Sequence, residues 1–348
     1  MTKHVVGWAS AAVVSVWVLG VSLLTATATA AQGNAAASAT GSHKAVDRPA
    51  AVSRTPWGHP DVQGTWTSEP EFGVPFERPA EFGTRQILTD AEYAQRLART
   101  QKQAEAALDE IDVFAVDTSN AGAVGSPTSP PPHWLERSTA SRRTSLVIDP
   151  PDGRLPPTSA QAQERQRRQP RGSFGNGPFN GPEDFTQYDR CITFGGVPGA
   201  MFPAVYNANI RIIQSPDFLA ITYEMIHETR LVPLDGRAHL ASTTRQSLGD
   251  ARGRWEGDVL VIETTNFSGR TNYRGASDKL RLVERFSRVD EKTLQYEVTV
   301  EDPDTWARPW KAALTLTPQP QGMFEYACHE GNYGMFNMLK AARAAEKP

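Results

Sequence analysis

The sequence predicts a mainly β protein whose short antiparallel strands curl into a barrel or a strongly curved sheet. The first observation is a tight turn at residues 256–258 between two predicted strands within residues 252–267, where Val259, Val261 and their neighbours are β-branched. Gly257 supplies the positive φ angle that such a turn often needs. The second observation is that strand-like runs follow at regular spacing, with polar turns and no helical pattern between them, at residues 280–289, 294–300 and 310–316. This spacing is typical of antiparallel barrels and sandwiches.

The first half of the chain predicts one long N-terminal helix and proline-rich segments that wrap around the sheet. Thr89 and Glu92 form a capping box, and apolar residues then recur at helical spacing, so we expect a helix over about residues 90–111. Residues 157–187 are largely polar and are predicted to be an irregular excursion. We therefore expect residues 53–348 to form a single β-rich domain.

The N-terminus has the pattern of a secretory signal peptide. A short basic lead precedes an almost wholly apolar run over residues 5–24, and small residues with an Ala-x-Ala pattern follow. We expect residues 1–31 to be removed and residues 32–52 to form a flexible lead. The alternative is a retained membrane anchor, because the apolar run is nearly long enough to span a bilayer. The pattern predicts a periplasmic or secreted protein that uses the general secretion route.

Composition excludes several classes of protein. The 348 residues carry a formal net charge of −3, which becomes −4 when the single charge of Lys3 leaves with the signal peptide. Because there is no basic block, neither nucleic acid nor a membrane surface is a predicted partner of the mature chain. The two cysteines, Cys191 and Cys328, form either one disulfide in an oxidising compartment or two buried thiols. Composition does not predict the oligomeric state.

One candidate acid/base site lies in a long strand predicted over residues 218–232. On a regular strand Tyr223, His227 and Thr229 share one face, which points His227 into an apolar interior, while Glu224 and Glu228 face the other way. A histidine in that place can act as a general base. The plainer interpretation is a hydrogen-bonded core histidine.

A second polar cluster consists of Asp235, Arg237 and His239, where a Leu-Asp-Gly-Arg sequence ends at Arg237 and His239 lies beyond it. This cluster is either an ordinary β-turn or a polar site at the rim of the barrel.

The third polar cluster comes after the last strand, in Cys328-His329-Glu330-Gly331-Asn332. We expect His329 and Glu330 to line the open end of the barrel or to pair with arginines. The sequence has no His-x-x-x-His pair, no phosphate-binding loop and no Gly-x-Ser-x-Gly elbow. Neither a metal nor a cofactor is therefore predicted.

Five strings after residue 188 carry a resemblance to a known group of proteins. They are Arg190-Cys-Ile-Thr-Phe-Gly-Gly-Val-Pro198, Pro233-Leu-Asp-Gly-Arg-Ala-His239, Gly249-Asp-Ala-Arg-Gly-Arg-Trp-Glu-Gly-Asp258, Glu301-Asp-Pro-Asp-Thr-Trp-Ala-Arg-Pro-Trp310 and Tyr326-Ala-Cys-His-Glu-Gly-Asn332. In these strings the chain resembles a large uncharacterised family of exported bacterial proteins, and more broadly it is similar to lipocalin-like β-barrels. The resemblance implies a lipocalin-like barrel and an envelope location, and it implies no reaction.

Two interpretations of function follow, and we favour the first. It is a cofactor-free acid/base enzyme of the lyase, hydratase or isomerase type, acting on an apolar or aromatic substrate in a barrel cavity. His227 would be the base, Tyr223 its proton-relay partner, and His329 or Glu330 the acid. The alternative is a non-catalytic, lipocalin-like ligand-binding protein of the periplasm. In both, a small molecule would contact Trp255, Tyr326, Arg237, His239 and Asn332. The enzyme requires His227 and His329 to share one cavity.

Overall fold

The computed structural model describes residues 52–109, 141–170, 172, 177–204, 206–269 and 273–346. The predicted signal peptide (residues 1–31) and all but the last residue of the predicted flexible lead (residues 32–52) lie outside the described residues. The last two residues of the helix predicted over residues 90–111 also lie outside them.

A single ten-stranded antiparallel sheet dominates the described part of the chain. Its order is β5-β4-β3-β1-β10-β9-β8-β7-β6, and β2 pairs with β10 off this path. The strands are β1 Gly64–Thr67, β2 Val147–Asp149, β3 Asn209–Gln214, β4 Phe218–Tyr223, β5 Thr229–Pro233, β6 Asp250–Glu256, β7 Val259–Thr265, β8 Arg281–Asp290, β9 Thr293–Glu301 and β10 Trp310–Pro318.

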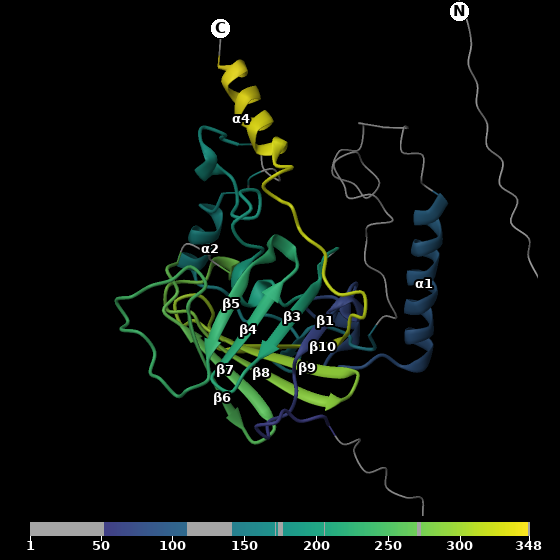
Figure 1. The fold of residues 1–348 in the computed structure, drawn as a ribbon. Coiled ribbons are helices and arrows are strands. Elements are labelled where there is room, and N and C mark those ends of the chain that lie inside the picture. The colour runs from purple at the N-terminus through teal and green to yellow at the C-terminus, as the bar shows by residue number, and fades with distance from the viewer. Residues whose placement is uncertain are drawn as a thin grey trace, which may run out of the picture. The chain divides into compact units, whose positions relative to one another are not determined.

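The two edge strands, β5 and β6, come into contact and nearly close the sheet into a barrel (Figure 1). Gly253 on β6 permits the close approach. A Cβ atom at this position would lie 2.5 Å from Cδ2 of Leu234 and 3.0 Å from Cγ1 of Val232. The predicted mainly β fold, an antiparallel lipocalin-like barrel, is confirmed.

Alternation along the strands fills the barrel interior with large apolar side chains. On β8, buried Leu282, Glu284 and Phe286 alternate with half-buried residues, and β9 has the same period. The interior apolar residues include Trp66, Ile210, Ile212, Leu219, Ile221, Val232, Leu260, Ile262, Leu282, Phe286, Leu294, Val298, Val300, Leu314 and Leu316. Their burial is the main term that stabilises the barrel, so charged side chains among them are exceptions that require an explanation.

The strand predicted over residues 218–232 is interrupted, so that prediction was wrong. β4 ends at Tyr223, β5 begins at Thr229, and a short 3₁₀ turn, Met225–His227, lies between them. Ile226 and His227 adopt positive φ angles of 63° and 43° in this turn. The chain therefore reverses direction where the sequence pattern predicts continuous strand.

Four helices accompany the barrel in the described ranges: α1 Asp90–Asp109, α2 Ala160–Arg167, α3 Gly196–Gly199 and α4 Tyr333–Ala345. The predicted long N-terminal helix is confirmed as α1. Its capping box forms as expected, because Oε2 of Glu92 accepts hydrogen bonds from the backbone N and Oγ1 of Thr89, both at 2.8 Å. α1 packs against the segment before β2, where Arg96 donates to the carbonyl oxygens of Ser141 and Arg143.

The stretch predicted to be irregular, residues 157–187, contains α2 and a 3₁₀ turn at Pro182–Asp184. Ser159 caps α2 by accepting a hydrogen bond from the backbone N of Ala162 at 3.0 Å. Further 3₁₀ turns lie at Glu69–Glu71, Ala80–Phe82 and Tyr273–Gly275.

Wrapping segments cover both ends of the barrel. At the end with the β6–β7 turn, His59 stacks on Trp255 with ring centroids 4.7 Å apart. At the opposite end, where β10 begins and the segment after β7 crosses, an aromatic cap forms from Phe76, Phe202, Tyr273, Trp306 and Trp310. The segment that follows β10 runs past β1 and β3 towards α4 (Figure 1).

One buried ion pair, between Arg230 of β5 and Glu284 of β8, lies among the apolar residues of the barrel interior. We expect Glu284→Gln to lower the free energy of unfolding by about 3–5 kcal/mol, because it leaves a buried guanidinium without its counter-charge. Urea unfolding measures this loss. The matched control is Glu297→Gln on β9, which faces outward towards Lys311 at 3.4 Å and should cost less than about 1 kcal/mol. Equal losses for the two variants would contradict this account.

Candidate functional site

The candidate site is a group of buried polar side chains inside the barrel, which we call the interior polar cluster. It consists of Tyr223 at the end of β4, Glu228 directly before β5, Arg230 on β5, Glu284 on β8 and Tyr296 on β9. Strand alternation places all five on the inner face, among apolar neighbours. These residues come from segments far apart in the sequence, and the barrel brings them together.

Arg230 and Glu284 form the centre of the interior polar cluster. The two terminal nitrogens of Arg230 donate to the two oxygens of Glu284, each at 2.7 Å, and both side chains are almost fully buried. The Tyr296 hydroxyl adds a third hydrogen bond to Oε1 of Glu284 at 2.9 Å. Burial lowers the pKa of Arg230, but the Glu284 carboxylate outweighs this effect and the net pKa is raised. Arg230 therefore stays charged, and the carboxylate of Glu284 accepts three hydrogen bonds.

Tyr223 has a buried hydroxyl that the cluster does not satisfy. The hydroxyl adjoins the Arg230 guanidinium, yet among the described residues it has no hydrogen-bond partner of normal geometry. Nε of Arg230 is also buried without a partner. Burial is the main cause that raises the pKa of Tyr223, so the phenol stays neutral. A buried donor or acceptor left in this state costs about 1–3 kcal/mol.

Glu228 presents two further unsatisfied atoms. Both of its carboxylate oxygens are buried, and neither has a hydrogen-bond partner of normal geometry in the described ranges. Burial raises the pKa of Glu228, and this effect exceeds the opposing influence of the Thr193 hydroxyl and of Arg230. The residue as a whole is only half-buried, because it stands where β5 begins at an end of the barrel. Glu228 thus lies between the barrel interior and the solvent.

The four residues predicted to be catalytic are not brought together. Tyr223 points into the barrel, whereas His227 is exposed on the turn and its Nδ1 contacts the carbonyl oxygen of Tyr326 at 3.1 Å. His329 and Glu330 are exposed on the segment before α4. The prediction that His227 shares an inward face with Tyr223 was wrong, because the chain turns between them. The catalytic roles themselves stay predictions, without support from this geometry.

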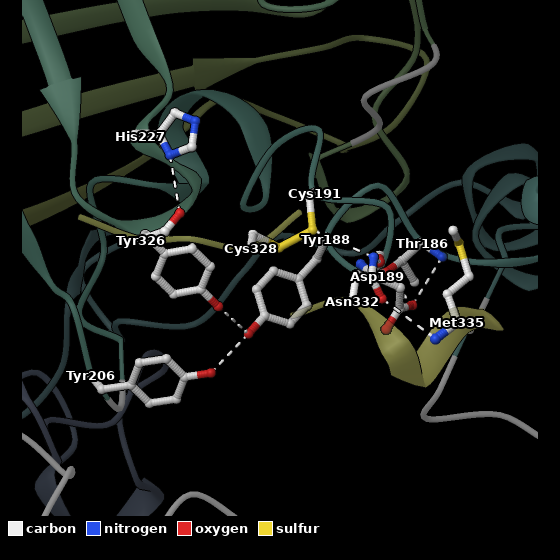
Figure 2. The surroundings of a disulfide bond; sticks show 10 residues. All are labelled: Thr186, Tyr188, Asp189, Cys191, Tyr206, His227, Tyr326, Cys328, Asn332 and Met335. Atoms are coloured by element: carbon white, nitrogen blue, oxygen red, sulfur yellow. Dashed lines mark hydrogen bonds between the residues drawn. A yellow bond between two sulfur atoms is a disulfide. The ribbon is translucent and has the colours of Figure 1, made fainter. Parts of the chain in front are cut away.

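The predicted disulfide between Cys191 and Cys328 is confirmed, with Cα atoms 5.8 Å apart (Figure 2). It ties the segment before α4 to the segment that carries Thr193. Asn332 strengthens the link: its Nδ2 donates to the carbonyl oxygen of Asp189 at 2.7 Å, and its Oδ1 caps α4. Asn332 therefore has a structural role in positioning this segment.

Three tyrosine hydroxyls meet beside the disulfide (Figure 2). The hydroxyl of Tyr188 lies 2.8 Å from that of Tyr206 and 3.1 Å from that of Tyr326. Burial is the largest cause that raises the pKa of Tyr326 to about 12, and it raises the pKa of Tyr188 as well. Tyr188 and Tyr326 therefore stay neutral, and the hydrogen bonds among the three hydroxyls link the C-terminal segment to the residues before β3.

The other predicted ligand-binding residues lie apart from the interior polar cluster. Trp255 stacks on His59 at the opposite end of the barrel. Arg237 pairs with Asp235 on the exposed β5–β6 loop. His239 contacts Asp250 at 2.9 Å. These three residues make separate contacts, and their roles in ligand binding stay predictions.

Sequence reasoning missed Glu228, Arg230 and Glu284. A signal existed for Glu284, because the alternation Leu282, Glu284, Phe286 puts a carboxylate at an inward position of β8. Glu228 and Arg230 were hidden by the wrong strand assignment, which places Glu228 on the outer face.

Comparisons with known proteins add little to this geometry. No family model matches the sequence, and no curated protein matches it. Among solved structures, the chain is similar to a secretary abundant heat soluble (SAHS) protein from Ramazzottius varieornatus. The two are 12% identical with a TM-score of 0.24, over 38% of this chain and 86% of that chain. A likeness this low carries no argument about function, and the resemblance to an uncharacterised exported family stays a prediction.

Neither a metal centre nor a membrane-spanning helix is found among the described residues. No group of three or more His, Cys, Asp or Glu side chains is arranged there to hold a metal ion. None of the helices in the described ranges has the length and hydropathy that a membrane span requires.

The raised pKa of Glu228 predicts a pH-dependent stability difference between the protein and Glu228→Gln. The unfolded-state pKa is about 4.3, so below this pH both proteins carry a neutral side chain. As the pH rises through the higher folded-state pKa, the native carboxylate loses stability and the glutamine does not. We expect the variant to gain in relative stability from about pH 4 upward, measured by urea unfolding across the pH range.

Glu256→Gln is the control of opposite sign. Glu256 is exposed on the β6–β7 turn, and hydrogen bonds from Arg254 and Arg285 lower its pKa. The native protein should therefore lose its advantage over this variant as the pH falls. A difference between native protein and Glu228→Gln that does not change with pH would contradict the buried, unsatisfied state of Glu228.

Proposed function

We propose that this protein binds a small apolar or aromatic molecule at the interior polar cluster. The observation that carries the proposal is the set of buried, unsatisfied atoms on Tyr223, Glu228 and Arg230 at the same end of the barrel. A native fold retains such atoms at a cost in stability, and hydrogen bonds to a ligand remove that cost. Sites of this kind combine an apolar lining with a few convergent polar groups.

The surroundings of the cluster support an apolar body for the ligand. Tyr223 belongs to the same buried apolar cluster as Val197, Met201 and Tyr273, which lie in the segments covering this end of the barrel. Glu228 offers the route of entry, because it reaches from the interior to the barrel end. Because side chains fill the described interior, a molecule can reach the hydroxyl and the carboxylate only if the covering segments move apart.

A second candidate function is a cofactor-free acid/base enzyme at the same cluster. The observation that favours it is the raised pKa of Glu228 beside a second titratable group, Tyr223. Perturbed titratable pairs are frequent at catalytic sites, where a carboxylate with a raised pKa serves as base or acid. An enzyme of the lyase, hydratase or isomerase type should still bind its substrate but lose turnover when Glu228 is changed to Gln. A simple binding protein has no turnover to lose.

We also propose that the protein works outside the cytoplasm, in the periplasm or as a secreted protein. The signal pattern of residues 1–31 and the disulfide between Cys191 and Cys328 support this location, because structural disulfides persist in oxidising compartments.

The binding proposal predicts opposite effects for two buried tyrosines of one cluster. Tyr223→Phe removes a hydroxyl without a partner, so the free energy of unfolding should stay unchanged or rise by about 1 kcal/mol. Tyr296→Phe removes a donor to Glu284 and should lower it by about 1–3 kcal/mol. Thermal and urea unfolding measure both. If Tyr223→Phe is as destabilising as Tyr296→Phe, the hydroxyl has a structural partner and the proposal loses its support.

Ligand binding is tested by titration calorimetry with 2-phenylethanol, phenethylamine and phenylacetate. We expect saturable binding of at least one of these probes to the native protein. Binding should weaken in Tyr223→Phe and stay unchanged in a control, Tyr333→Phe, whose ring is exposed on α4. If none of the three binds, or if the two variants behave alike, the proposal is wrong.

A further inference from the structure

The interior polar cluster contains an imbalance of charge. It holds two carboxylates, Glu228 and Glu284, and one guanidinium, Arg230. Both terminal nitrogens of Arg230 already donate to Glu284, which also receives the Tyr296 hydroxyl. Glu228 forms no ion pair among the described residues, and its two buried oxygens accept no hydrogen bond of normal geometry there; the Thr193 hydroxyl and the charge of Arg230 are its favourable neighbours.

We propose that the ligand of this site carries a cationic nitrogen, an ammonium group, that donates to the Glu228 carboxylate. This inference rests on the binding function proposed above and names the class of ligand: a small amine with an apolar or aromatic body. An ammonium has several donors. It can therefore serve both oxygens of Glu228 and the lone pairs of the Tyr223 hydroxyl at once.

The same arrangement disfavours an anionic ligand. The positive charge of Arg230 is neutralised by Glu284 at 2.7 Å, so it offers little net attraction to a second carboxylate. Glu228 would repel such a ligand, because like charges in a site that excludes water interact strongly. A neutral alcohol fits the hydroxyl of Tyr223 and leaves the carboxylate without a counter-charge. Specificity for an amine therefore comes from Glu228.

The turn that carries Glu228 is held in place from two sides. On one side, Glu224 at the start of the turn accepts hydrogen bonds from Nδ2 of Asn209 at 2.5 Å and from the backbone N of Phe324 at 2.7 Å. On the other side, His227 contacts the carbonyl oxygen of Tyr326. These contacts position the Glu228 backbone, so its carboxylate points inward before a ligand arrives, which lowers the cost of binding.

The test compares three probes of similar size at pH 7: phenethylamine, 2-phenylethanol and phenylacetate, whose groups are cationic, neutral and anionic. We expect phenethylamine to bind the oxidised native protein more tightly than the other two. Glu228→Gln should weaken phenethylamine binding by about tenfold or more, because it removes a charge-assisted hydrogen bond, and should change 2-phenylethanol binding by less than about threefold. Glu228→Gln removes an unpaired buried charge, so it is expected to fold.

A surface carboxylate provides the matched control. Glu81→Gln changes the net charge by the same amount at an exposed position on the Ala80–Phe82 turn, and it should leave phenethylamine binding unchanged. If Glu228→Gln does not weaken phenethylamine binding, or if phenylacetate binds more tightly than phenethylamine, the amine inference is overturned while the binding function stands. If none of the probes binds, both the inference and the binding function fail.

Discussion

The bidentate ion pair between Arg230 and Glu284 is the interaction on which the rest of the barrel interior depends. It joins β5, an edge strand, to β8 across the interior, so it holds the nearly closed edge of the sheet in place. The pair is tolerable in an apolar environment because every oxygen of Glu284 is hydrogen-bonded. With Arg230 committed to Glu284, the neighbouring Tyr223 and Glu228 keep hydrogen-bonding capacity that the fold does not use.

The disulfide acts on this site indirectly, through the segments that it joins. Cys328 fixes the C-terminal segment, which contacts the turn after β4 through Phe324 and Tyr326. Cys191 fixes the opposite segment, whose Thr193 lies beside Glu228. A covalent link between segments 137 residues apart therefore surrounds the turn that carries the unsatisfied carboxylate. Because the disulfide already holds these segments in place, less conformational entropy is lost when a ligand binds.

Most of the barrel was predictable from the sequence, because strand alternation and turn residues are local signals. The β6–β7 turn at Gly257 and the alternation on β8 and β9 needed no tertiary information. The turn after Tyr223 was not predictable, because Ile226 and His227 adopt positive φ angles that their residue types seldom favour. The site could not be assembled for the same reason, since one misplaced turn moves Glu228 to the wrong face.

We propose that Tyr223 and Glu228 stay unsatisfied in the free protein because a ligand completes their hydrogen bonds. A high-resolution crystal structure of the oxidised protein with phenethylamine tests it most directly. The account predicts density for the molecule inside the barrel, with its nitrogen within hydrogen-bond distance of the Glu228 carboxylate. Density for ordered water alone at these atoms, or direct hydrogen bonds between Tyr223, Glu228 and Arg230 that satisfy all three, would contradict the claim.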